Sequence, residues 1–499
     1  MAALGTAIAL PGPSSVTAAA VVMHPTVSDF VQVSASTTPP TQAQCASAVP
    51  VHRRCFSPQA IQSAYNLGPL YAAGHDGRGM TIAIVDSFGS DTIAHDLHVF
   101  DTAFGIAPMC GEEGVACASG MPTFSQLHFQ AQVPTNPIPG SGTTGLEDHT
   151  LWALEVSLDV ETAHAMAPGA NILLVTTPTA ETLGVQGFPN FMNAEQFVID
   201  HHLANVISQS FASAEDAFSS FQSLLNLRHA YISAAAQGVT VLGSSGDSGT
   251  ANTTKQSTVG PGGLGAGPNQ LIPFPSVEWP ASDPLVTGVG GTYLCTDPNA
   301  GTNDPRTVDS VSPPTNCQSH PGVAEVGWVA AGGGFSHVFS RPSYQDTLPA
   351  GSTAIGSMRG VPDIGLQASS RTGALIYISL PPQGSGGLRC PTASGGSAPC
   401  STGWYDIGGT SLSCPQWAAL VAIADQINGG GLGLINPALY KIGANATMYA
   451  NDFFDVTTGK NQTDPSIPGY PATTGWDPVT GLGTPNAANL IPDLVAASH

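Results

Sequence analysis

The sequence predicts an α/β fold, with a mostly parallel central sheet flanked by helices in one large domain. From about residue 57 to residue 245, short apolar runs alternate with segments of helical periodicity. Alternation of this kind is typical of βαβ units, whose right-handed crossovers place successive strands parallel. Beyond residue 250, loops rich in Gly, Pro, Ser and Thr separate shorter apolar segments. Loops carried on a rigid sheet are where functional sites tend to lie.

The individual elements follow from local patterns. Buried strands are predicted from continuous apolar runs, and helices from apolar residues that recur three or four positions apart. The predicted strands are residues 80–86, 171–177, 205–210 and 238–245, and the predicted helices are residues 149–167, 190–204 and 217–237.

Residues 1–51 differ in composition from the rest of the chain. They consist mostly of Ala, Ser, Thr, Val and Pro with little periodicity, and the first residues lack the Lys or Arg of a signal peptide. We expect this segment to be a low-complexity tail or linker, and residues 52–499 to form the domain.

The charge balance is strongly acidic. Asp and Glu outnumber Lys and Arg by 34 to 12, which gives a formal net charge of −22. Nucleic acid is therefore not expected as a partner, because binding it requires a basic surface. Carboxylates become neutral near pH 4, so the composition suits a protein that works in acid. Solubility alone is the alternative explanation for the charge.

Eight of the nine cysteines fall into four close pairs. In Gly- and Pro-rich loops such pairs indicate disulfides formed in an oxidising compartment, and hence a secreted protein, although spacing does not fix their connectivity. No CxxC pair or Cys/His cluster with zinc spacing is present, so no zinc site is expected. Cys414 is left over and is expected to be a small buried side chain. The pairs are Cys45 and Cys55, Cys110 and Cys117, Cys295 and Cys317, and Cys390 and Cys400.

No apolar run approaches the roughly 20 residues of a membrane span, so no membrane association is expected.

The stretch IGGTSLSCPQWAAL (407–420) takes a loop into an apolar helix and places Ser411 at the junction. A serine at this position is either a helix N-cap or a nucleophile. A nucleophilic serine needs a base to accept its proton and donors to stabilise an oxyanion.

Glu155 and Asp159 are candidates for that base. They lie four residues apart on a predicted helix, so their carboxyl groups project from one face. Apolar neighbours would keep the pair dry and raise the pKa of one member, which makes a base that operates in acid. A solvated acidic helix face is the alternative.

Asp247 lies in the turn GSSGDSGT, after a predicted strand. Ligands of open α/β folds gather at the carboxyl ends of the strands. A protonated Asp247 could donate a hydrogen bond to a developing oxyanion, whereas an ordinary turn residue is the alternative.

These residues stand within a series of motifs that resembles the sedolisins, a family of serine-carboxyl peptidases related in fold to the subtilisins. The resemblance covers about residues 52–499, and its motifs occur in the family's order. They are IQSAYNL, TIAIVD, LEVSLDVETAHAMAPGANILLV, VISQS, GVTVLGSSGDSGT, FPSVEWPASDPLVTGVGGT, GGGFSHVFSRPSYQ, RGVPDIGLQAS, IGGTSLSCPQWAAL and GWDPVTGLGTP.

The resemblance implies a role for each candidate residue. Ser411 would be the nucleophile, Glu155 its general base, Asp159 the carboxylate that orients Glu155, and Asp247 the oxyanion donor. A secreted, monomeric endopeptidase that cleaves polypeptides in acid is expected.

Other features of the family are matched in part. The glutamate and tryptophan that extend the family's carboxylate network fall here on Asp86 and Phe211. The family's calcium site implies one structural Ca²⁺, whose ligands are expected to be Asp455, Val456, Thr473, Gly475 and Asp477, with a threonine where a glycine is usual. Sedolisins usually carry a long N-terminal prosegment, and none is recognisable in residues 1–51.

Two alternatives remain open. A subtilisin-type protease would share the strand ending at Asp86 and the GGTS loop, but it needs a histidine base. His149 lacks the His-Gly-Thr context of that base. The second alternative is a secreted binding protein that keeps the fold without catalysis.

Overall fold

The computed structural model describes the chain except for several short segments. The described residues are 24–25, 30–48, 53–130, 146–178, 187–254, 258–260, 263–265, 271–300, 306–310, 313–380 and 389–499.

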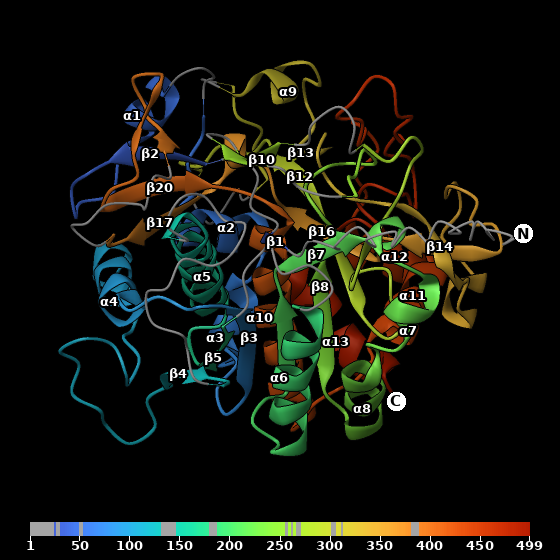
Figure 1. Ribbon diagram of the computed structural model, residues 1–499, viewed down its shortest axis with the longest axis horizontal. Coiled ribbons are helices and arrows are strands. Elements are labelled where there is room, and N and C mark those ends of the chain that lie inside the picture. Colours follow the sequence, from blue (N-terminus) through green and yellow to red (C-terminus); the bar gives the residue numbers. More distant parts are fainter. Residues whose placement is uncertain are drawn as a thin grey trace, which may run out of the picture.

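An eight-stranded, mostly parallel sheet forms the centre of the molecule (Figure 1). Seven strands follow the order β13-β12-β8-β6-β3-β5-β4, and β16 also pairs with β12. Every neighbouring pair is parallel except β12–β13. The strands are β3 (Thr81–Ser87), β4 (Phe124–His128), β5 (Asn171–Thr177), β6 (Val206–Gln209), β8 (Thr240–Ser244), β12 (Thr287–Leu294), β13 (Glu325–Gly327) and β16 (Ile364–Gln367).

The central strands are buried on both faces. In β3, Ile82 and Ile84 enter one hydrophobic core, whereas Ala83 and Val85 enter a second core on the opposite face. Side chains that alternate between two apolar layers explain why the strand is an unbroken apolar run. By the same alternation, the next residue, Asp86, points to the face of Ile82 and Ile84.

Helices cover both faces (Figure 1). α6 (Phe188–Asp200) and α8 (His229–Gln237) pack together and contribute to the second core. α5 (Leu146–Met166) and α10 (Thr410–Asn428) pack against each other on the other face, and α13 (Ala487–Ala497) packs on α10. Asp86 therefore points toward the layer that contains α5 and α10.

The remaining elements lie around this core. The helices are α1 (Gln42–Ser47), α2 (Pro58–Ala64), α3 (Gly68–Ala72), α4 (Ile93–Phe104), α7 (Phe221–Leu225), α9 (Thr315–Gln318), α11 (Asn436–Ala444) and α12 (Ala446–Asp452), with 3₁₀ turns at Glu215–Ala217, Ser343–Asp346 and Ser370–Thr372. The strands are β1 (His24–Pro25), β2 (Phe30–Ser34), β7 (Phe211–Ala214), β9 (Thr258–Gly260), β10 (Gly263–Gly265), β11 (Glu278–Trp279), β14 (Gly334–Ser340), β15 (Met358–Val361), β17 (Ala374–Ile378), β18 (Arg389–Pro391), β19 (Ser397–Pro399), β20 (Gly403–Ile407), β21 (Phe453–Phe454) and β22 (Thr484–Pro485).

The predicted strands are confirmed, whereas two predicted helices differ. The helix predicted over residues 217–237 is divided into α7 and α8, because Ser220 caps a separate short helix that ends at Asn226. α6 stops at Asp200, four residues before the predicted end. His202 takes a left-handed backbone conformation with φ of 51°, and the Leu203 N–H turns back to the Val198 carbonyl.

Residues 30–48 fall within the segment expected to be a tail or linker, yet they pack on the domain. β2 pairs with β20, with Phe30 opposite Ile407, and Phe30 and Val31 are buried. Cys45 on α1 is joined to Cys55. The pairing partner of β2 lies about 370 residues further along the chain, so local composition could not reveal it.

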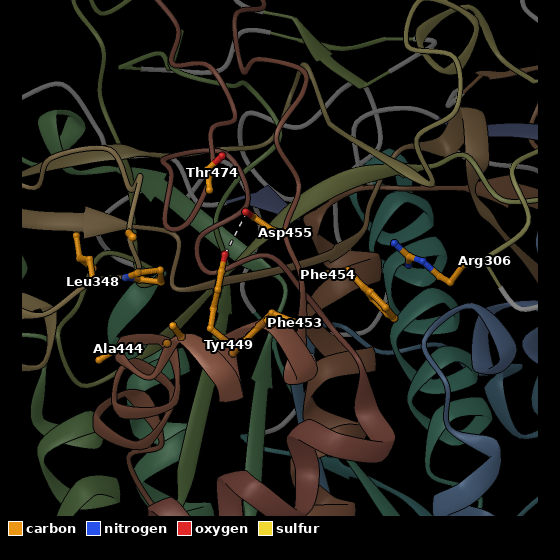
Figure 2. A pocket seen from close by; sticks show the side chains of 13 residues that line it. Arg306, Leu348, Ala444, Tyr449, Phe453, Phe454, Asp455 and Thr474 are labelled. Carbon is orange, nitrogen blue, oxygen red and sulfur yellow. Dashed lines mark hydrogen bonds between the residues drawn. The ribbon is translucent and has the colours of Figure 1, made fainter.

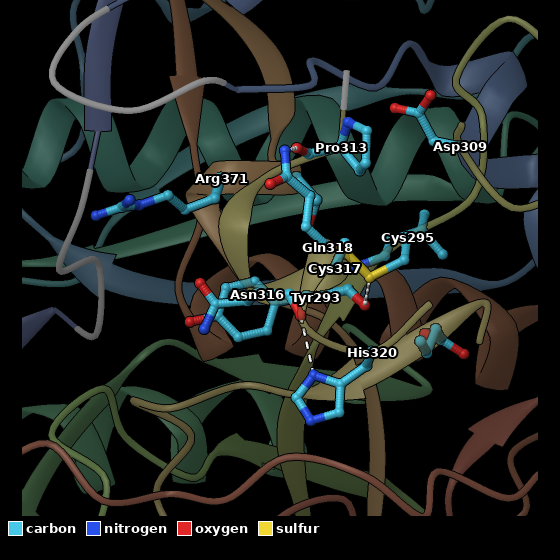
Figure 3. The surroundings of a disulfide bond; sticks show 12 residues. Tyr293, Cys295, Asp309, Pro313, Asn316, Cys317, Gln318, His320 and Arg371 are labelled. Atoms are coloured by element: carbon cyan, nitrogen blue, oxygen red, sulfur yellow. Dashed lines mark hydrogen bonds between the residues drawn. A yellow bond between two sulfur atoms is a disulfide. The ribbon is translucent and has the colours of Figure 1, made fainter. Parts of the chain in front are cut away.

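All four expected cysteine pairs are disulfides. Figure 3 shows the Cys295–Cys317 bond, which ties α9 to the end of β12. Within the described part of the chain, no helix combines the length and apolar character needed to cross a membrane.

Candidate active site

Three neighbouring strands bring polar side chains to one edge of the sheet. β8, β6 and β3 are parallel neighbours, so their carboxyl ends lie together. Asp86 lies at the end of β3, Ser210 directly follows β6, and Asp247 follows β8. The site is therefore at the sheet edge where ligands of open α/β folds bind.

Glu155 and Asp159 come to this edge from α5, which packs on β3 and α10. Both carboxyl groups are fully buried, and so are the flanking Trp152, Leu154 and Leu158. The predicted pair is thus not a solvated acidic face. A one-turn separation places both carboxyl groups over the end of β3.

Asp86, Glu155 and Asp159 form one electrostatic cluster. Burial raises the pKa of Glu155 and of Asp159 well above the usual range, and the charge of Asp86 raises both further. Burial also raises the pKa of Asp86 to about 8. Hydrogen bonding by Ser210 opposes this effect at Glu155 and Asp159. The cluster therefore retains protons at pH values where exposed carboxyl groups are ionised.

Ser411 is the second residue of α10, and its side chain is fully buried. Its hydroxyl faces Glu155 closely enough to lower the pKa of that carboxyl as a hydrogen-bond partner. Neither Glu155 oxygen, however, makes a hydrogen bond of regular geometry with the described residues. The N-cap of α10 is Gly409, with φ of 133°, a conformation that side chains disfavour. Ser411 is thus not the helix cap.

The Asp247 side chain accepts a hydrogen bond from a backbone N–H group at the start of α10, as an N-cap side chain would. Its Oδ1 accepts hydrogen bonds from the Thr410 N–H at 2.7 Å and from the Thr410 hydroxyl at 3.0 Å. The Thr410 hydroxyl in turn accepts from the Gly246 N–H at 3.0 Å. Asp247 is therefore fixed directly beside the turn that carries Ser411.

Glu278 is a further buried carboxyl group at this edge, and it was not among the site residues predicted from the sequence. A Cβ atom at Gly246 would lie 2.2 Å from Glu278 Oε2, so the Glu278 carboxyl packs directly on the backbone before Asp247. Burial, followed by the Asp247 charge, raises the pKa of Glu278 to about 8. In the sequence, its position within the VEWP motif was the feature that could have pointed to this residue.

No family model matches the sequence. Kumamolisin from Bacillus sp. (strain MN-32) is 28% identical over 463 residues, which cover 92% of this chain and 66% of that protein. This similarity indicates the sedolisin family of serine-carboxyl peptidases.

Further relatives agree with this assignment. Human tripeptidyl-peptidase 1 is 28% identical over 362 residues, covering 68% of this chain and 52% of the relative. Tripeptidyl-peptidase SED1 from Arthroderma otae is 33% identical over 314 residues, covering 58% and 40%. The chain thus spans between 40% and 66% of the length of these curated relatives.

A solved structure supports the fold. Pseudomonas sedolisin, a serine-carboxyl proteinase in complex with pseudo-iodotyrostatin, superimposes with a TM-score of 0.59 at 24% identity. The match covers 88% of this chain and 98% of that one.

Against the sedolisin pattern, the two departures noted in the sequence have different consequences. Asp86 still interacts electrostatically with Glu155 and Asp159. Phe211 is buried, with its ring centre 4.3 Å from that of Phe191. A phenyl ring has no hydrogen-bonding group, so Phe211 continues the apolar wall and not the proton network.

Cys414, one helical turn beyond Ser411, is a buried free cysteine as expected. Burial raises the pKa of its thiol to about 12, and the Ser208 hydroxyl lies 3.4 Å from its sulfur. A thiol of this kind is not reactive.

The two loops with the expected calcium ligands are in contact. The Gly475 N–H donates to Asp455 at 3.1 Å. Asp477 is buried and accepts from the Val479 and Thr480 N–H groups at 2.8 and 2.9 Å. The donor set contains only oxygen atoms from carboxylates and carbonyls, which is the chemistry that Ca²⁺ prefers. These residues therefore fit a calcium ion.

A cavity of about 820 Å³ adjoins the calcium loops (Figure 2). Asp455 and Thr474 lie on its wall, and the Tyr449 hydroxyl donates to Asp455 across it at 3.1 Å. None of the four predicted catalytic residues lines this cavity.

Proposed function

We propose that this chain is a secreted serine-carboxyl endopeptidase that cleaves polypeptides in acid. The observation that carries the proposal is the buried contact between Ser411 and Glu155, within a cluster that also contains Asp86 and Asp159. The similarity to sedolisin-family peptidases supports the same reaction. The four disulfides suit secretion into an oxidising compartment.

Ser411 is the nucleophile in this proposal. Its hydroxyl oxygen attacks the peptide carbonyl while Glu155 accepts the hydroxyl proton. Glu155 then returns the proton to the leaving amine, and an acyl-enzyme remains on Ser411. Water hydrolyses this ester by the same proton transfers.

Asp247 is the oxyanion donor. Thr410 fixes its Oδ1, so the proton of the neutral carboxyl group is carried on Oδ2, from which it is donated to the oxyanion. An ionised Asp247 could not donate and would repel the oxyanion. Activity is therefore expected to fall as the pH rises and Asp247 loses its proton.

Asp159 and Asp86 are positioning residues. Asp159 orients Glu155 from the next turn of α5, and Asp86 acts on both through charge. Since three adjacent buried carboxyl groups repel one another when ionised, the cluster carries little negative charge in acid.

Asp455, Asp477 and the carbonyl oxygens of Val456, Thr473 and Gly475 would hold one Ca²⁺. Bound there, the ion would cross-link the two loops and stabilise the fold. The segment it fixes precedes α13, which packs on the Ser411 helix.

The decisive experiment is hydrolysis of an unfolded protein from about pH 2 to pH 8 by the wild type, Ser411→Ala and Ser413→Ala. Ser413 is a matched control, because it lies on the same turn and its hydroxyl only donates to the Thr410 carbonyl. Acid activity that is lost in Ser411→Ala but kept in Ser413→Ala supports the proposal.

Other outcomes identify the alternatives. Activity that peaks near neutral pH indicates a histidine base, and a folded but inactive wild type indicates a binding protein. Analysis of products from a long peptide tests the endopeptidase mode, since release of tripeptides alone would contradict it. Gel filtration tests the expected monomer.

A further inference from the structure

A second cluster of titratable side chains lies away from the proposed catalytic residues. His98 and Asp101 are one turn apart on α4, and Glu112 lies in the loop after α4, which the Cys110–Cys117 disulfide closes. His164 lies in the last turn of α5. Two imidazoles and two carboxyl groups thus meet from three segments of the chain.

The geometry of this cluster is compact. The candidate ligand atoms of Asp101, Glu112 and His164 all lie within 4.8 Å of one another. Asp101 Oδ2 is 3.1 Å from His164 Nε2, and Glu112 Oε2 is 3.2 Å from His98 Nδ1. Ligands about 2.0–2.2 Å from a tetrahedral ion are themselves roughly 3.3 Å apart, so the separation between Asp101 and His164 suits a shared ion.

The cluster is also enclosed. The side chains of Asp101, Glu112 and His164 are at most 2% exposed, whereas His98 closes the solvent side at 43% exposure. Although Asp101 is buried and paired with His164, neither of its carboxyl oxygens makes a hydrogen bond of regular geometry to a described residue. A buried carboxylate with incomplete hydrogen bonding is costly unless a cation approaches it.

Two carboxyl groups so close together need a positive charge or a shared proton. A divalent cation would supply two positive charges and would also satisfy the oxygens of both carboxylates.

We propose that Asp101, Glu112 and His164 bind a structural Zn²⁺ ion, with His98, which contacts Glu112, on the solvent side of the site. Mixed imidazole and carboxylate ligands suit zinc, whereas calcium takes oxygen ligands almost exclusively. The site joins the end of α5 to α4 and to the disulfide-closed loop. Since α5 also carries Glu155 and Asp159, the ion would brace the helix that presents these carboxyl groups.

This site was not expected from the sequence, which contains no zinc spacing. The reason is that its ligands are spread along the chain from Asp101 to His164 and come together through the packing of α4 on α5.

Zinc retention by the untagged chain tests the proposal without any measurement of activity. Ser411→Ala serves as the background, so that self-digestion cannot interfere. The protein is stripped with a chelator, equilibrated at pH 7.5 with micromolar Zn²⁺ and dialysed, and its zinc is counted by mass spectrometry. One ion per chain is expected.

Asp101→Asn and Glu112→Gln should each weaken zinc binding by at least about tenfold. Even the loss of a residue that only hydrogen-bonds to a metal ligand typically has an effect of this size. Glu113→Gln is the matched control. Glu113 is the next residue of the same loop, is exposed, and pairs with His95 at 2.5 Å. This variant should keep its zinc.

The absorption spectrum of the Co²⁺-loaded background protein provides a measurement that does not depend on any ligand variant folding. Intense visible bands, which are typical of tetrahedral cobalt, are expected. Failure to retain zinc, or equal loss in Glu112→Gln and Glu113→Gln, would overturn the proposal. The cluster would then be an ion-pair network held by protons alone.

Discussion

Replacing Asp86 with Asn should change how the stability of the protein depends on pH. The pKa of Asp86 in the folded chain is about 8, whereas its ordinary value is 3.8. Folding is therefore most favourable below about pH 4, where Asp86 is protonated in both states. Stability is lost as the pH rises toward 8, because the unfolded chain releases this proton first.

The size of the effect follows from that difference. At about 1.36 kcal/mol per pKa unit, the gap between 3.8 and about 8 corresponds to roughly 6 kcal/mol. This is an upper value, because burial is the whole cause of the shift and any water that reaches the ionised group would reduce it. Net stabilities of domains are about 5–15 kcal/mol, so even half of it would dominate the pH dependence.

The assay is urea unfolding at intervals from pH 4 to pH 8, in a Ser411→Ala background. Asn matches protonated Asp86 in shape, so Asp86→Asn should resemble its parent at pH 4 and exceed its stability at pH 8. Asp91→Asn, which changes an exposed residue just after β3, is the control. The reasoning would be refuted if the free energy of unfolding fell between pH 4 and pH 8 by the same amount, to within about 1 kcal/mol, in the parent and in Asp86→Asn.

Three further predictions concern the active site and the calcium loops. Glu155→Gln should lower kcat by about 10²–10⁴-fold with little change in KM, measured on a peptide substrate at the pH optimum. Asp247→Ala should lower kcat by about 10²–10³-fold, whereas Asp247→Asn should retain more activity and retain it to higher pH, because an amide donates without a titrating proton; equal pH profiles would contradict this role. If free Ca²⁺ is about a hundred times its Kd, chelating it should lower the free energy of unfolding of the wild type by about 3 kcal/mol, as measured by thermal unfolding. The stability of Asp455→Asn should not change on chelation.

Features set by local patterns were predictable from the sequence. The apolar run at β3 and the period of α5 gave the right elements, because each pattern reflects the faces that the element buries. The four-residue spacing of Glu155 and Asp159 correctly placed both carboxyl groups together. The close spacing of eight cysteines also indicated disulfides, since short loops bring their ends together readily.

Features set by distant packing were not predictable. β2 joins the domain by pairing with β20, and Glu278 lies on β11, which pairs with β7. The division between α7 and α8 depends on the cap at Ser220, a weaker signal than the apolar period that runs through the segment. The cluster around His164 likewise has no local signature.

The scarcity of basic residues connects the stability of this chain with its proposed chemistry. Arg359 neutralises Asp363 at 2.7 Å in the core, and this is how a buried carboxylate is ordinarily kept ionised. Only 12 Lys and Arg residues are available for 34 Asp and Glu residues, so most buried carboxyl groups must hold a proton or a metal ion instead. Asp86 and Glu155 have no Lys or Arg ion-pair partner in the described part of the chain. Protons bound at these positions favour the folded state, and a proton on Asp247 is what oxyanion donation requires. Acid therefore favours both the folded protein and the form proposed to be active.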